Sequence, residues 1–151
     1  MEISTRAATA VDLDAMAELI ARLNRDPESR CLHAGEEARE IRQALLQLSP
    51  PFASTFTLAI ALGEKGDVAL HDGRLLGVSG VDVDLAASRA WLWGPWIEHG
   101  NWSVVAPPLL DRVLWFVREL DRVDAYFDER AGRMGQLLSS RGFDQPHLTG
   151  D

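Results

Sequence analysis

Residues 88–120 read SRAWLWGPWIEHGNWSVVAPPLLDRVLWFVREL, and this stretch decides the fold. Its first part, 90–97, is an apolar and aromatic run that is typical of a buried strand. Polar residues interrupt the run at 98–103. Pro107 and Pro108 are expected to open a helix, because the amide that proline lacks would have no acceptor in a first helical turn. Apolar side chains then recur at helical spacing: Leu109, Leu110, Val113, Leu114, Val117 and Leu120.

The junction between this strand and this helix is the expected place for a small-molecule site. A helix N-terminus carries free backbone amides, and an anionic group can bind to them. In this chain the junction lies at residues 98–106, directly after the aromatic strand.

Composition limits the kinds of partner. The chain has 151 residues and fits a single domain, residues 1–151. Its net charge of −8 argues against nucleic acid and against an anionic membrane surface as partners. Cys31 is the sole cysteine and the four histidines show no ligand spacing, so we expect no disulfide and no metal. Without a signal-peptide core or an apolar run of roughly 20 residues, a cytoplasmic location is expected.

The N-terminal third predicts a strand and two helices. Residues 2–7 suit a first strand, and the stretch from Thr9 to Asp12 has the pattern of a capping box, with Asp in place of the usual Glu. The helix that follows has one apolar face, formed by Leu13, Met16, Ala17, Ile20 and Leu23. A second helix starts near residue 36 and is stopped by the prolines of 49–51.

The remaining segments complete an α/β pattern. Residues 56–62 and 75–83 suit strands, and Asp72-Gly73 between 68–70 and 75–83 is a hairpin signal. After the central helix, 123–127 predicts a short strand and 129–140 a last helix. The order β-α-α-β-β-β-α-β-α predicts a mixed central sheet with helices on both faces.

This order of elements resembles the GCN5-related N-acetyltransferase (GNAT) family of acetyl-CoA-dependent transferases. The resemblance covers nearly the whole chain. It is carried by five segments: 5–15, 72–78, 93–97, 109–114 and 137–143. It implies a GNAT-like α/β fold with a shortened C-terminal strand region, because only eight residues follow Phe143.

The resemblance also implies an acetyl-CoA site. In the family, the motif Arg/Gln-x-x-Gly-x-Gly/Ala before the central helix offers backbone amides to the CoA pyrophosphate. Residues 101–106 match it only in degenerate form, since Asn101 replaces the Arg or Gln, Val104 replaces the central glycine, and Ala106 alone fits. The cofactor-binding residues implied are Trp96, Ile97, Asn101, Trp102, Ser103, Val104, Val105 and Ala106.

The implied reaction is transfer of the acetyl group from acetyl-CoA to a primary amine of a small molecule or peptide. A carboxylate near the end of the fourth strand often serves as base in this family, and Glu98 stands there. The tyrosine that many members use as acid corresponds to Leu138 here, while Tyr126 lies on the preceding strand. A catalytically silent GNAT-fold domain that is structural, dimerising or ligand-binding is therefore the alternative.

Two further expectations concern packing. Strand alternation places Trp91 and Trp93 on one face and Trp96 on the other, with two of the three in the core. The short C-terminus would leave a sheet edge uncovered, and an uncovered edge can pair with another chain. We therefore expect a homodimer, or a second GNAT-like domain, to complete the sheet.

Overall fold

The computed structural model describes residues 2–66, 70 and 73–144. Five strands form one sheet in the order β1-β2-β3-β4-β5, antiparallel except for the parallel pair of β4 and β5. The strands are β1 (Ile3–Ala7), β2 (Phe56–Leu62), β3 (Gly73–Asp84), β4 (Arg89–Ile97) and β5 (Arg122–Asp124). The helices are the 3-10 helix η1 (Ala10–Asp12), α1 (Leu13–Asn24), α2 (Ala38–Leu46), α3 (Phe52–Thr55), α4 (Trp102–Phe116) and α5 (Gly132–Ser140). The predicted mixed α/β architecture is confirmed.

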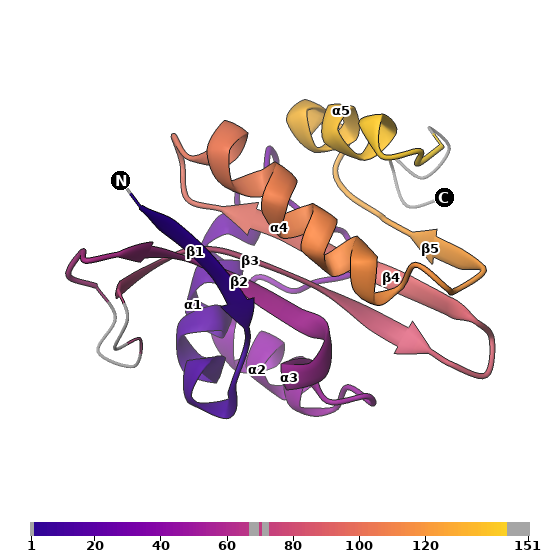
Figure 1. Cartoon of the computed structure of the whole chain (residues 1–151), viewed down its shortest axis with the longest axis horizontal. Helices are drawn as coiled ribbons and strands as arrows, with labels where there is room; N and C mark the ends of the chain where they lie inside the picture. The colour runs from indigo at the N-terminus through magenta and orange to yellow at the C-terminus, as the bar shows by residue number, and fades with distance from the viewer. Residues whose placement is uncertain (1, 67–69, 71–72, 145–151) are drawn as a thin grey trace.

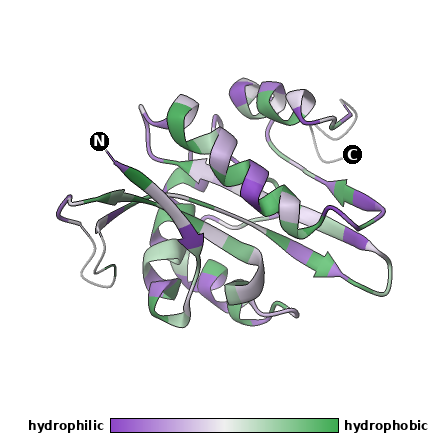
Figure 2. Ribbon diagram, viewed as in Figure 1, coloured by the Kyte–Doolittle hydropathy of each residue, from purple (hydrophilic) through white to green (hydrophobic). Residues whose placement is uncertain are grey.

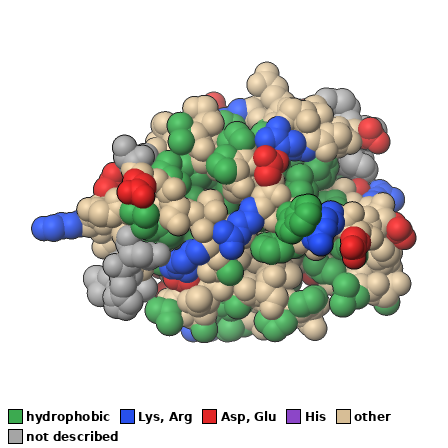
Figure 3. All heavy atoms as spheres, in the orientation of Figure 1, with side chains coloured by type: hydrophobic (Ala, Val, Ile, Leu, Met, Phe, Trp, Pro, Cys, Tyr) green, Lys and Arg blue, Asp and Glu red, His purple; other side chains and the backbone are tan. Residues whose placement is uncertain are grey.

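Helices cover both faces of the sheet, with α1, α2 and α3 on one side and α4 and α5 on the other (Figure 1). Side chains of a strand alternate between its faces, and β2 serves both cores in this way. Leu58 and Ile60 join the core under α1 and α2, whereas Ala59 and Ala61 join the core under α4. Hydrophobic and hydrophilic residues alternate along the helices that pack on the sheet (Figure 2). In this same orientation, which shows both helical layers from the side, acidic, basic and apolar side chains are interspersed on the surface (Figure 3).

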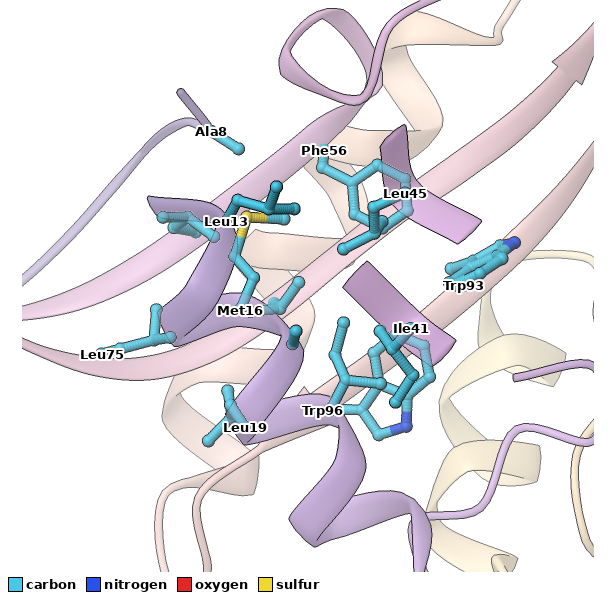
Figure 4. Packing of buried hydrophobic residues seen from close by; sticks show 14 of the residues in the cluster. Ala8, Leu13, Met16, Leu19, Ile41, Leu45, Phe56, Leu75, Trp93 and Trp96 are labelled. Atoms are coloured by element: carbon cyan, nitrogen blue, oxygen red, sulfur yellow. The ribbon is translucent and has the colours of Figure 1, made fainter. Parts of the chain in front are cut away.

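A bulge in β4 changes which face its tryptophans occupy. Gly80 pairs with Trp93 and Val78 with Trp96, so two residues of β4 stand opposite one residue of β3. The prediction that Trp96 lies on the opposite face from Trp93 is therefore wrong. Both side chains belong to the α1/α2 core, where their rings meet edge to face at 6.2 Å (Figure 4). The prediction that two of the three strand tryptophans are buried is confirmed.

The central helix begins earlier than the sequence predicts. α4 starts at Trp102, and Pro107 and Pro108 lie inside it instead of opening it. A proline deprives the carbonyl four residues before it of a hydrogen bond, here those of Ser103 and Val104. Both residues are exposed, so water can hydrogen-bond these carbonyls and the helix tolerates the two prolines.

The predicted strands 56–62 and 75–83 are confirmed as β2 and as part of β3. β2 and β3 pair from Leu62 opposite Gly73 onwards. The expected short strand at 68–70 lies largely outside the described residues. Within the described part of the chain, no helix is both long and apolar enough to cross a bilayer.

Candidate functional site

The turn between β4 and α4 presents backbone donors. The first bonded amide of α4 is that of Val105, which donates to the Asn101 carbonyl at 2.9 Å. In the described part of the chain the amides of Trp102, Ser103 and Val104 have no acceptor, and the Asn101 side chain does not cap them. Three adjacent N–H groups at a helix N-terminus, where the helix dipole is positive, form an arrangement that can bind an anion.

The other predicted cofactor residues are placed differently. The side chains of Trp96, Ile97, Val105 and Ala106 are fully buried in the cores. The Val105 amide donates to the Asn101 carbonyl, so the free donors are those of residues 102–104 and not the predicted run from Trp102 to Ala106. Val104, in the position of the motif glycine, directs its side chain to solvent with 62% exposed. Binding of acetyl-CoA by these residues stays a prediction.

Arg133 of α5 supplies a cation that the sequence did not reveal. Its guanidinium lies over the Trp102 ring, 4.5 Å from the ring centroid, and Nη2 donates to Ser29 Oγ at 3.4 Å. Its Nε is buried and has no hydrogen-bond partner in the described structure. The motif position Asn101 is neutral, and a guanidinium from a distant helix lies beside the first residue of α4 instead. No local pattern marks such a residue, because the contact depends on how α5 packs.

Glu98 lies at the edge of a cavity on the opposite side of the sheet. The cavity has a volume of about 460 Å³ and is lined by one face of α1, the start of β3 and Glu98. The Glu98 carboxylate forms an ion pair with Arg22 of α1. The neighbouring His99 is 60% exposed, and its Nε2 lies 3.6 Å from Asp26 Oδ2. Glu98 is thus next to both the α4 N-terminus and a cavity. Its role as a base stays a prediction.

The space where β4 and β5 separate is occupied by the segment that follows α1. β5 pairs with β4 only as far as Trp91 opposite Asp124. Beyond that point Cys31 forms an antiparallel bridge with Phe127, and the Leu32 amide donates to the Tyr126 carbonyl at 2.8 Å. On the other side, the Cys31 thiol lies 3.8 Å from the Leu92 carbonyl of β4. Residues 30–32 therefore lie between the two strands.

Asn24 fixes this segment. Its Oδ1 accepts from the Cys31 amide at 2.7 Å and from the indole N–H of Trp96 at 3.1 Å. Its Nδ2 donates to the carbonyls of Ala34 and Gly35, both at 2.9 Å. One buried amide side chain thus connects α1, the segment after it and β4. Burial raises the pKa of the Cys31 thiol to about 12, so this thiol is not a nucleophile at neutral pH.

Comparison with known proteins identifies the fold. No family model matches the chain, and no curated protein matches it. Among solved structures, a GNAT-family acetyltransferase from Staphylococcus aureus aligns with 97% of this chain and 89% of its own at 14% identity, with a TM-score of 0.66. A phosphinothricin acetyltransferase from Sinorhizobium meliloti, in complex with acetyl-CoA, aligns with 95% of this chain and 76% of its own at 12% identity and TM-score 0.68. The fold is that of the GNAT acetyltransferases.

A third GNAT-fold neighbour is larger. N-acetylglutamate synthase from Neisseria gonorrhoeae, complexed with coenzyme A and N-acetyl-glutamate, matches 95% of this chain at 17% identity and TM-score 0.59. This chain spans 28% of that protein's length.

On this GNAT fold, the three unbonded amides at the start of α4 and the nearby Arg133 guanidinium are groups that could hold a pyrophosphate such as that of acetyl-CoA. Leu138, which the resemblance places where many GNAT members have a tyrosine, is buried in the core and offers no proton. In the described residues, no group of three or more His, Cys, Asp or Glu side chains is arranged to hold a metal ion.

Proposed function

We propose that this chain binds acetyl-CoA at the N-terminus of α4 and transfers the acetyl group to a primary amine of a small molecule or peptide. The observation that carries the proposal is the set of amides of Trp102, Ser103 and Val104, which have no acceptor in the described structure and follow β4 directly on a GNAT fold. That some neighbours of this fold hold coenzyme A or acetyl-CoA supports the choice of ligand.

Bound acetyl-CoA would supply a thioester carbonyl that an amine can attack. The chain's own contribution is to bind and to move protons. The amides of α4 bind phosphate oxygens, and the Arg133 guanidinium adds positive charge nearby. Glu98 accepts a proton from the acceptor ammonium through water, and Arg22 orients its carboxylate. Because Leu138 carries no proton, solvent supplies the proton for the leaving sulfur.

A charge placed at the α4 N-terminus tests the phosphate site. In Ser103→Asp, the new carboxylate occupies the free amides and repels phosphate, so we expect acetyl-CoA affinity to fall by about tenfold or more. The same carboxylate favours the helix dipole, so the melting temperature should not fall. Isothermal titration calorimetry with acetyl-CoA measures the affinity, and thermal unfolding measures stability.

The matched control is Ser103→Asn, which has nearly the same shape without the charge and should retain the wild-type affinity. If Ser103→Asp binds acetyl-CoA with wild-type affinity, the phosphates of acetyl-CoA bind somewhere other than the start of α4. The absence of any heat when wild-type protein is titrated with acetyl-CoA would contradict the proposed function itself.

A second candidate function is a catalytically silent GNAT-fold domain. It is favoured by the segment 30–32 that fills the space between β4 and β5, and by Leu138 in place of a tyrosine. The two candidates differ in one measurement, because a silent domain remains folded while acetyl-CoA gives no heat.

A further inference from the structure

The cavity beside Glu98 has the charge pattern of a site for a small zwitterion. Its wall on the α1 side is formed by Ala15, Glu18, Arg22 and Arg25, which follow one another at helical spacing and so share one face. Arg74 of β3 and Glu98 close it, and the buried side chains of Leu19, Ala21 and Leu75 contribute apolar surface. Its volume of about 460 Å³ lies within the range of about 300–1,000 Å³ that is common for small-molecule sites.

The three arginines of the cavity are not equally engaged. Arg22 is ion-paired with Glu98, and Arg74 Nε lies 3.0 Å from Glu64 Oε2. Arg25 donates from Nε to the Glu36 carbonyl at 3.0 Å, and within the described part of the chain its guanidinium has no carboxylate partner. Arg25 is therefore the cation that is free to bind an external carboxylate.

Negative charge lies in the same cavity. The Glu98 carboxylate is at its edge, and Glu18 has no ion-pair partner in the described part of the chain. A guanidinium without a carboxylate partner and carboxylates near it together match a ligand that carries both a carboxylate and an ammonium group.

We propose that this cavity binds the acceptor and that the acceptor is a free amino acid or a comparably small amino carboxylate. Its carboxylate binds Arg25, and its ammonium lies towards Glu98. The inference rests on the proposed function, since an acceptor is needed only if the chain transfers an acetyl group. A protein substrate or an extended polyamine fits the cavity less well, because neither presents a carboxylate beside its amine.

The reaction balances with the groups already named. The new N–C bond forms as the C–S bond of the thioester breaks. The ammonium loses two protons in all: one passes through water to Glu98 and on to solvent. The second is also released to solvent, and solvent protonates the leaving sulfur to give the free thiol. No oxidant, reductant or metal is needed.

The test is direct binding in the absence of acetyl-CoA. The full chain is screened by thermal shift against the twenty common L-amino acids, and the dissociation constant of the best one is measured by calorimetry. The probe for the carboxylate is the amine made by removing it, for example ethylamine for alanine or isoamylamine for leucine. We expect the amino acid to bind at least about tenfold tighter than its decarboxylated amine, as for a charge-assisted hydrogen bond.

The variant Arg25→Gln should weaken binding of the amino acid by about tenfold and leave binding of the amine unchanged. Arg39→Gln is the matched control, because Arg39 is an exposed arginine of α2 that does not line the cavity, and it should behave as wild type. Equal affinity for amino acid and amine, or no binding of any amino acid, would overturn the inference.

The same titrations separate this inference from the proposed function. If acetyl-CoA binds and no amino acid does, the assignment of the cavity as an amino-acid site is wrong and the proposed transferase function is retained. If an amino acid binds with the expected dependence on Arg25 and acetyl-CoA gives no heat, the proposed transferase function is wrong, and the cavity remains an amino-acid site.

Discussion

At the residue scale, Asp12 is a charged group that is 1% exposed and fully engaged. Arg6 donates two hydrogen bonds to it, at 2.7 and 2.9 Å, and the Thr9 amide donates a third at 2.8 Å. Burial raises the pKa of this carboxyl, but the hydrogen bonds from Arg6 and Thr9 outweigh burial and hold it below its ordinary value of 3.8. The capping box predicted at Thr9 and Asp12 is confirmed.

Asp12→Asn should therefore lower the free energy of unfolding by about 2 kcal/mol at pH 7, because charged hydrogen bonds in a buried setting are lost. A carboxyl whose pKa is lowered by folding stabilises above its unfolded pKa, and the stabilisation disappears as pH falls through the folded pKa. The difference between wild type and variant should thus be full at pH 7 and shrink below about pH 4. Urea titrations at pH 7 and pH 3 measure it.

Asp14→Asn is the control for this charge change. Asp14 is 80% exposed and pairs with Arg42 on the surface, so the substitution should change stability by less than about 0.5 kcal/mol. A difference between wild type and Asp12→Asn that is as large at pH 3 as at pH 7 would show that shape, and not charge, accounts for it.

At the element scale, the bulge of β4 depends on Gly94. Its φ of +80° lies in the region that favours glycine, and a Cβ there would come within 2.8 Å of the Trp96 amide nitrogen. We expect Gly94→Ala to lower the free energy of unfolding by about 3 kcal/mol, as measured by guanidinium denaturation, since strain and a steric clash add.

Gly100→Ala separates these two terms. Gly100 has a φ of +85°, but a Cβ at this position would meet no atom within 4 Å, so only strain remains and about 1 kcal/mol is expected. An equal decrease in the free energy of unfolding in the two variants would mean that the backbone around the bulge shifts to accommodate the added Cβ.

Local patterns predicted the elements well and failed where tertiary packing decides. Alternation could not place Trp96, because the bulge puts two residues opposite a single partner, and only the Gly94-Pro95 pair within the strand hinted at it. The start of α4 was placed too late because Pro107 suits a first turn, yet it is also tolerated where the affected carbonyl faces water.

At the scale of the whole molecule, the site combines residues that are distant in the sequence. Glu98 and the start of α4 are neighbours in the chain, so sequence reasoning could find both. Arg133, Arg22 and Asn24 belong to α5 and α1, and only the packing of α5 beside the start of α4 and of α1 against β4 brings them there. Arginines on helix surfaces are common, and nothing in their spacing distinguishes these from others.

The last prediction concerns the edge of the sheet formed by β5. Among the described strands, β5 has three residues and lies at one edge of the sheet. A cavity of about 640 Å³ lies beside it, lined by the end of α4 and by residues 141–144. An unpaired edge favours association, so we expect a homodimer or a second similar domain on this side. For the homodimer, light scattering after size exclusion should give twice the chain mass of 16.7 kDa at micromolar concentration, and a monomer would contradict it.

The bridge between Cys31 and Phe127 affects the binding of any ligand between β4 and β5. A molecule that inserts between β4 and β5 must first displace residues 30–32, and the backbone groups so released have to find new partners. Only the small fraction of molecules in which the bridge has opened is competent to admit it, and the apparent dissociation constant is the intrinsic one divided by that fraction. The strength of the hydrogen bonds from Asn24 to this segment would then set how readily the space between β4 and β5 can be occupied.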